Sequence, residues 1–399
     1  MTLSSARLST NGAQEIVNIS VNYVKPFFQL LRNELWQQGT VPTALSLPLF
    51  SCVQRFARQQ TVWGLVSNSI VRNNVKTGDD NAMEAMGTTI THQRTAQKMQ
   101  SVMVQIAEAL EGRATADNNG QPPIPYAVFK GQAVAVLYPT PHCRTLGDID
   151  IYFPKEHFQG GVERIEQRLG ISVHREELDK HYDCELDDVR IELHYRVETF
   201  GSSRHQRYFD RMVDADICTP SPTRIDIGGV GVRTFSPMVH TLVVFKHLFN
   251  HFLVEGVGLR QFCDMAMLLH HYHDAMPADA LQRHLRGMGY RRAFLATTML
   301  LVKKLGMPEA DSPLPLSEQR DTPWARRLLE EAAQRGNFGA NDRHADETSR
   351  QKSLNTARVA MRHCLQYMPL AWWDILCLIP RRVGVTLRRH LRKNNDETA

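Results

Sequence analysis

The chain has 399 residues, of which 42% are hydrophobic and 22% are charged. These fractions are close to those of ordinary globular proteins, so they exclude a wholly disordered chain or a fibrous repeat and leave room for two or three domains. The 47 Lys and Arg residues against 42 Asp and Glu residues give a formal charge of +5, a mild excess that suits a polyanionic ligand but is far from histone-like.

The beginning of the chain has no apolar core of signal-peptide length, so export is not expected. The most apolar stretches, residues 241–249 and 370–380, are far shorter than the ~20 apolar residues that a membrane span requires. Seven cysteines without a Cys-x-x-Cys pair indicate reduced thiols rather than a disulfide framework or a zinc cage. We therefore expect a soluble, cytoplasmic protein.

The first part of the chain has mainly helical periodicity. Residues 73–87 interrupt it as a polar break, and residues 111–125, rich in Asn, Gly and Pro, form a linker. We expect a helical N-terminal region over residues 1–115. Within it, apolar residues recur at three- and four-residue spacing over residues 24–36, 47–68 and 91–110.

Short strands are predicted in the middle of the chain. The helix over residues 155–169 should stop at Gly170, and a shorter helix is predicted over residues 132–138. Residues 124–235 should form an α/β core with a small mixed sheet. The alternation of polar and apolar residues predicts its strands at residues 126–129, 148–153, 182–186 and 189–197, with a hairpin over 224–234.

The helical period returns after Ser236 and continues to the end of the chain. We divide this part into two regions. Residues 236–310 should form a helical region that lines a cleft against the α/β core, and residues 311–399 should form a helical C-terminal region whose tail is basic and amphipathic. The fold class expected for the whole chain is α+β, with the small sheet between helical regions. The helices are predicted over residues 238–254, 259–274, 278–288 and 291–305, and again from residue 353.

The segment most informative about chemistry is KGQAVAVLYPTPHCRTLGDIDIYF, residues 130–153. In a strand, Asp148 and Asp150 point to one face, while Ile149 and Ile151 point into the core. Two neighbouring carboxylates repel each other unless a cation lies between them. Their oxygens suit Mg²⁺, which takes one or two carboxylates and completes its shell with water and phosphates.

A second acidic residue follows the same logic. In VRIELHYRV, residues 189–197, alternation places Glu192 and His194 on the face opposite Ile191. If this strand neighbours DIDIYF, Glu192 completes a three-carboxylate site for two metal ions. Such a site serves phosphoryl or nucleotidyl transfer.

These segments together resemble the nucleotidyltransferases of the polymerase-β-like superfamily. The nearest likeness is to a family of uncharacterised bacterial nucleotidyltransferases that carry a KG…YP…R…GDIDI segment followed by an ELHYR-like strand. The likeness is tightest over residues 130–196. It continues more loosely through KHLFNHF and GLRQFCD to GNFG at residues 336–339.

The resemblance implies a magnesium-dependent enzyme. It would transfer a nucleoside monophosphate from an NTP, with ATP the expected donor, to an acceptor hydroxyl and release pyrophosphate. Asp148 and Asp150 match the pair that binds the metal ions and the triphosphate, and Glu192 matches the third carboxylate and is a candidate for the base. The acceptor stays open: a small molecule, a protein side chain or an RNA end.

The resemblance also assigns residues to the nucleotide. Gly131 matches the glycine that lets the backbone approach phosphates, although the usual Gly-Ser pair is here Gly131-Gln132, which leaves the grip on the γ-phosphate open. The cations that would meet the phosphates are Lys130, Arg144 and Lys246.

Each of these residues also has a structural interpretation. The carboxylates could be solvated strand charges, His194 could be a structural histidine, and Lys246 could snorkel from a packed helix face. Arg260 and Asp264 could form an ion pair on a helix surface or brace the nucleotide cleft.

Two interpretations concern other functions. His247 and His251, at i and i+4, have zinc-binding spacing, but capping or surface positions are more typical of such histidines. The basic tail could contact nucleic acid or an anionic membrane surface. The alternative function is therefore a catalytically inactive nucleotide- or RNA-binding module with the same fold.

Overall fold

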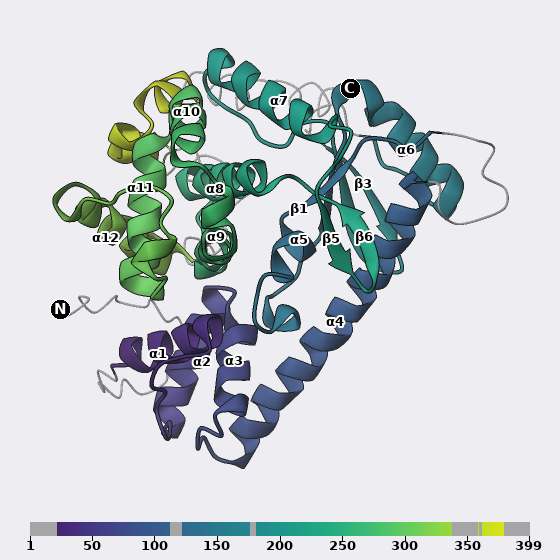
Figure 1. Cartoon of the computed structure of the whole chain (residues 1–399). Helices are drawn as coiled ribbons and strands as arrows, with labels where there is room; N and C mark the ends of the chain where they lie inside the picture. Colours follow the sequence, from purple (N-terminus) through teal and green to yellow (C-terminus); the bar gives the residue numbers. More distant parts are fainter. Residues whose placement is uncertain (1–21, 112–121, 176–180, 337–357, 359–360, 379–399) are drawn as a thin grey trace, which may run out of the picture.

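The computed structural model describes residues 22–111, 122–175, 181–336, 358 and 361–378. It is an α+β fold in which a four-stranded mixed sheet and a separate two-stranded hairpin lie among helices, and this confirms the predicted fold class (Figure 1). No described helix is long and apolar enough to cross a membrane. The basic end of the predicted tail lies outside the described residues.

The strand order in the sheet is β1–β2–β4–β3. β2 and β4 are parallel neighbours, while β1 and β3 pair antiparallel at the two edges. The predicted hairpin is confirmed as β5 and β6, joined by Gly228 and Gly229. The bounds are β1 Ala127–Phe129, β2 Ile149–Tyr152, β3 His181–Leu186, β4 Val189–His194, β5 Arg224–Ile227 and β6 Val230–Arg233.

Two helices follow strands of the sheet. α5, Gly131–Ala135, leaves β1, and α6, Lys155–Leu169, leaves β2. α6 ends where predicted, because Gly170 adopts φ 66°, a left-handed conformation that glycine reaches without steric cost.

The helix predicted over residues 47–68 is wrong as a single helix. α1, Val24–Trp36, matches its prediction, but the next segment divides into α2, Leu47–Gln59, and α3, Trp63–Arg72. At the break, the side chain of the buried Gln60 accepts a hydrogen bond from the backbone N–H of Leu259 at 3.1 Å. Tertiary contacts therefore outweigh the local helical period here.

The polar break predicted over residues 73–87 is wrong in its second half. α4 begins at Asp79 and runs 33 residues to Glu111, about 50 Å. Asp79 and Asp80 lie in the first turn, where carboxylates stabilise the positive end of the helix dipole. The first turns are largely exposed, so they lack the apolar stripe on which the prediction depended.

The remaining helices confirm the predictions after Ser236 and add one that was missed. The missed helix is α7, Ser203–Ile217, whose buried stripe of Phe209, Val213 and Ile217 is diluted by charged residues. The predicted helix over residues 291–305 ends in a π-helical turn, Leu301–Leu305. The later helices are α8 Pro237–Val254, α9 Leu259–Tyr272, α10 Ala278–Met288, α11 Arg291–Leu300 and α12 Glu318–Arg335.

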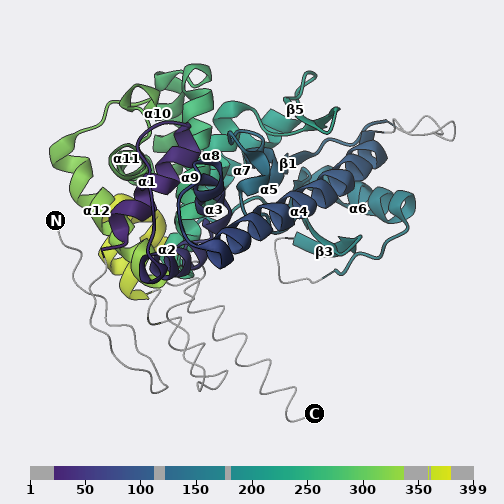
Figure 2. The same ribbon diagram turned by 90° about the horizontal axis from the view of Figure 1, so that it is seen from below.

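Buried apolar side chains form two clusters on opposite faces of the sheet. The larger joins α1–α3 with α8–α12 and reaches the sheet through Phe129 and Tyr152. The smaller contains Ile149, Ile151 and Ile191 together with α6 and the second half of α4. α4 runs along the molecule from α2 and α3 to the sheet (Figures 1 and 2). The predicted domain division stays a prediction.

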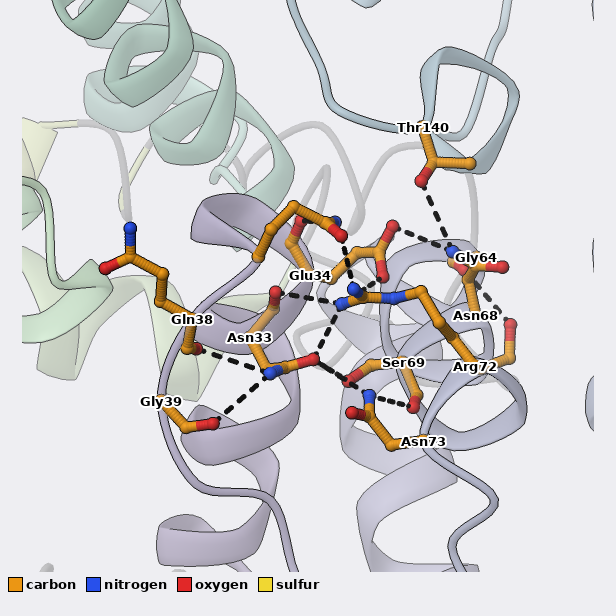
Figure 3. Close-up of polar contacts among 12 residues, drawn as sticks. Asn33, Glu34, Gln38, Gly39, Gly64, Asn68, Ser69, Arg72, Asn73 and Thr140 are labelled. Carbon is orange, nitrogen blue, oxygen red and sulfur yellow. Dashed lines mark hydrogen bonds and ion pairs between the residues drawn. The ribbon is translucent and has the colours of Figure 1, made fainter.

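A buried polar cluster joins α1 to α3 (Figure 3). Arg72 donates to the side-chain oxygen of Asn33 at 2.7 Å, and Asn68 donates to Glu34 at 2.8 Å. Asn68 also reaches the hydroxyl of Thr140 at 3.4 Å. Burial raises the pKa of Glu34 despite these partners. The cluster holds the segment before β2 against the N-terminal helices.

Candidate active site

The register of two parallel strands brings the predicted carboxylates together. Asp150 on β2 lies directly beside Glu192 on β4, and both face away from the cluster that contains Ile149, Ile151 and Ile191. The alternation predicted from the sequence is therefore confirmed. This geometry depends on β2 and β4 being neighbours, which the sequence left as a condition.

Asp150 is buried between two nitrogen groups. The ammonium of Lys130 lies 3.0 Å from its Oδ1, and Nε2 of His194 lies 2.9 Å from the same oxygen. Burial by itself would raise the pKa of Asp150, but Lys130 and His194 outweigh it and hold that pKa well below its usual value. Asp150 is therefore ionised in the folded protein.

Asp148 stands just before β2 and is only half-buried. Its pKa is raised, first by burial and then by the charges of Asp150 and Glu192, which Lys130 offsets only in part. The site thus holds more negative charge than its described neighbours neutralise. A bound cation would relieve that repulsion.

Glu192 has partners from two strands. Nε2 of His194 lies 3.2 Å from its Oε2, and Nδ1 of His181, on β3, lies 3.7 Å from the same oxygen. The exposed Arg190 lies 3.2 Å from the other oxygen. Burial would raise the pKa of Glu192, yet the two histidines lower it to about 2.

His194 contacts both central carboxylates, a role to which its sequence position alone pointed only weakly. The imidazole is fully buried and bridges Asp150 and Glu192. The sequence signal was its position two residues after Glu192 on one strand, hence on the same face. His181 carried no such signal, because its approach depends on the pairing of β3 with β4.

Gly131 lies at the turn between β1 and α5, against the carboxylate site. Its φ is 32°, and a Cβ at this position would lie 3.2 Å from the backbone oxygen of Asp148. A side chain here would therefore press on the segment that carries the carboxylate. Its approach to phosphates stays a prediction.

One family of known proteins matches most of the chain. A family model described as uncharacterised nucleotidyltransferase matches residues 49–306, well over half of the chain. The chain belongs to that nucleotidyltransferase family. No curated protein matches it.

Two solved structures share weaker similarity with this nucleotidyltransferase. The antibiotic-resistance factor ANT(2'')-Ia is 18% identical, with 51% of this chain and 97% of that chain covered and a TM-score of 0.32. An antigenic nucleotidyltransferase-like protein from Paracoccidioides brasiliensis is 14% identical, with 56% and 96% covered and the same TM-score. Likeness at this level carries no argument about substrates.

In this nucleotidyltransferase Arg144 is held by a buried ion pair. Its guanidinium donates to the two oxygens of Asp264 on α9 at 2.7 and 2.8 Å, and Tyr138 donates to Asp264 at 2.7 Å. The surface ion pair predicted between Arg260 and Asp264 is wrong, because Asp264 is buried and binds Arg144, while Arg260 donates to the backbone of Thr145. A contact of Arg144 with nucleotide stays a prediction.

Lys246 lies in a second buried cluster, within α8. Its ammonium donates to Asn250 and, at 2.9 Å, to Tyr290, and it lies 3.7 Å from Asp374 in the C-terminal segment. The snorkelling interpretation is wrong, because only 1% of Lys246 is exposed. Its role at the triphosphate stays a prediction.

Glu198 connects the second cluster to the carboxylate site. It accepts a hydrogen bond from Asn250 at 2.5 Å, contacts Nδ1 of His247 at 2.7 Å, and is among the charges that raise the pKa of Lys130. Burial, followed by the charges of Lys130 and His251, lowers the pKa of His247 well below its usual value. His247 and His251 each contact a different carboxylate, Glu198 and Glu255, instead of converging on one point.

Proposed function

We propose that this chain is a metal-dependent nucleotidyltransferase that transfers a nucleoside monophosphate from an NTP, with ATP the expected donor, to an acceptor hydroxyl and releases pyrophosphate. One observation carries the proposal: Asp150 and Glu192 lie side by side on parallel strands, with Asp148 at the start of the first. Family membership supports nucleotidyl transfer in general.

The residues present fit a pair of Mg²⁺ ions. Asp150 already has the ammonium of Lys130 against one oxygen, which marks a position where positive charge is stabilised. Burial, and then the charges of Asp150 and Glu192, raise the pKa of Asp148, and a divalent cation beside it would offset them. Asp148, Asp150 and Glu192 would hold the ions, which when bound neutralise triphosphate charge and lower the pKa of the acceptor hydroxyl.

The chain's own groups have separable tasks in this proposal. The ammonium of Lys130 is paired with Asp150. Once bound cations neutralise the carboxylates, that ammonium would be released to bind a phosphate. Glu192 stays the candidate base for the acceptor hydroxyl, as the resemblance implies, and its pKa of about 2 keeps it ionised. Arg144 stays a candidate for contact with the nucleotide, although its guanidinium is already paired with Asp264.

The direct test is label transfer. The purified chain is incubated with Mg²⁺, a lysate of its source cells and each of the four α-labelled NTPs, beside the Asp148→Ala/Asp150→Ala variant. We expect label to enter an acceptor fraction only with the unaltered chain. Equal labelling with both proteins would contradict the proposal, and the preferred NTP identifies the donor.

A second candidate is a binding module without catalysis, and one surface feature favours it. A hollow of about 1170 Å³ between α7, α8 and α10 is lined by four exposed arginines and one acidic residue, Asp216. Such a hollow suits a phosphate-rich ligand. The arginines are Arg204, Arg207, Arg211 and Arg286.

Isothermal titration separates the two candidates. NTP binding that requires Mg²⁺ and is lost in Asp148→Ala supports the enzyme. RNA binding that is independent of Mg²⁺ and is weakened by Arg207→Ala/Arg211→Ala, without label transfer, supports the module.

A further inference from the structure

Three metal-binding side chains converge beside the carboxylate site, at the pairing of β3 with β4. His181 and His194 are register partners on the two strands, and Glu192 stands two residues before His194. One donor atom from each lies within 4.8 Å of the others. Within the described part of the chain, no other such group of three was found.

The donor separations fit one ion. Nitrogen and oxygen ligands lie about 2.0–2.2 Å from Zn²⁺, so two of them at tetrahedral or octahedral angles are roughly 3.0–3.5 Å apart. Oε2 of Glu192 lies 3.2 Å from Nε2 of His194 and 3.7 Å from Nδ1 of His181. The donor nitrogens of the two histidines lie within 4.8 Å of each other, so side-chain rotation would have to bring the three donors onto one centre.

The ligand types select the kind of ion. Mg²⁺ takes oxygen ligands, whereas two imidazoles and a carboxylate are a donor set for Zn²⁺, Co²⁺ and related first-row ions. Asp148 and Asp150 present only oxygen, so the two halves of the site differ in the metal that they favour. Asp150 and Glu192 lie side by side, which keeps the two positions adjacent.

His194 joins this group to the rest of the carboxylate site. Its Nε2 lies 2.9 Å from an oxygen of Asp150 and 3.2 Å from Oε2 of Glu192, so one N–H at that nitrogen can be shared between the two carboxylates. Without that proton the same nitrogen is a metal ligand, and a bound dication would take the place of the proton beside Glu192.

We propose that His181, Glu192 and His194 form a binding position for a first-row transition-metal dication of the Zn²⁺ class, next to an oxygen-only position at Asp148 and Asp150. This site deepens the proposed function, because it shares Glu192 with the catalytic carboxylates. Binding of the ion itself does not require that function. One of the two ion positions of the proposed function would then take a transition-metal ion in place of Mg²⁺.

The test is a titration of the full-length, metal-free protein with Co²⁺ in excess Mg²⁺, followed by visible absorption and by side-chain ¹⁵N NMR of the histidines. We expect one equivalent of Co²⁺ to bind with ligand-field bands, and Zn²⁺ to displace it and shift the ¹⁵N resonances of His181 and His194. His181→Ala should weaken Co²⁺ binding about 10–100-fold or more. His157→Ala, which removes an imidazole outside the three-residue group, is the matched control and should bind as the unaltered chain does.

Equal Co²⁺ affinity in His181→Ala and the unaltered chain would overturn the proposal. Because His194 is fully buried, its variants can fail to fold; His181 retains some exposure and serves as the decisive position. Thermal unfolding of each variant checks that the fold is retained. If Co²⁺ binds but no label is transferred, the metal site is supported and the proposed function is contradicted. If label is transferred but Co²⁺ does not bind, the proposed function is supported and the metal site is contradicted.

Discussion

The chain contains two groups of charged side chains that differ in how far their charges are neutralised by neighbouring residues. Arg144 and Asp264 form a closed pair, in which one guanidinium meets one carboxylate through two hydrogen bonds. The group of Asp148, Asp150 and Glu192 is open: among the described residues, its close cationic neighbours are Lys130 and Arg190, and Arg190 also binds Asp183.

The difference separates structural charge from functional charge. A closed pair recovers its desolvation cost through geometry and gives little to a ligand. An open group can accept a cationic ligand, and the pKa of Asp148, raised by burial and then by the charges of Asp150 and Glu192, shows that its ionised form is not fully stabilised. Substitutions at Asp150, Asp264, His240 and Asp148 test this difference.

The largest effect is expected from Asp150→Asn on activity. Removing the charge that faces both Lys130 and Glu192 should lower the rate of nucleotidyl transfer by about 10³–10⁴-fold, or roughly 4–5 kcal/mol of activation free energy. Single-turnover kinetics with α-labelled NTP measures it. Retention of the full rate would mean that the open group is not catalytic.

Asp264→Asn should instead act on stability. It leaves the buried Arg144 without its charged partner, a change that costs about 3–5 kcal/mol in comparable buried pairs. Urea unfolding measures the loss, and the apolar double variant Arg144→Met/Asp264→Leu should recover most of it. If Arg144→Lys folds normally and raises only the KM for NTP, Arg144 binds nucleotide and the pair is not merely structural.

His240, buried near the closed pair, should make stability depend on pH. Burial lowers its pKa to about 4, so the unfolded chain, with an ordinary value near 6.5, binds more protons between these limits. Stability from this group is therefore complete above about pH 6.5 and decreases as the pH falls toward 4, by on the order of 3 kcal/mol. His240→Leu should flatten urea-unfolding free energies over that window; an unchanged slope would exclude His240 as the cause.

The smallest effect is expected from Asp148→Asn on the metal-free protein. Since the pKa of Asp148 is raised, its ionised form is disfavoured in the fold at neutral pH, and the neutral amide should raise the unfolding temperature by on the order of 2 °C. Calorimetry measures it. The same variant should lose activity. Removing the Asp148 carboxylate would thus stabilise the fold, whereas removing the Asp264 carboxylate from the closed pair destabilises it. A lower unfolding temperature would show that neighbouring residues already stabilise the charge of Asp148.

Local sequence patterns predicted most helices and strands, but not every point at which a helix begins or is interrupted. Period-two alternation placed Asp150 and Glu192 opposite the buried isoleucines, and Gly170 correctly ended α6. The division at Gln60 was missed: Thr61 adopts φ 54° there, and the side chain of Gln60 binds Leu259, about 200 residues away in sequence, a contact that no local period encodes. α4 was shortened because its first turns face solvent, and α7 was missed because charges dilute its apolar stripe.

Local patterns were enough to predict the α+β class, the strands that carry the carboxylates and the faces on which they lie, since these follow from the short-range periodicity of a pleated strand. Long-range packing makes β2 and β4 neighbours, pairs Arg144 with Asp264, and brings His181 and His194 to Glu192. Strand pairing and side-chain contacts across more than a hundred residues depend on which surfaces pack best, and no local pattern encodes that choice.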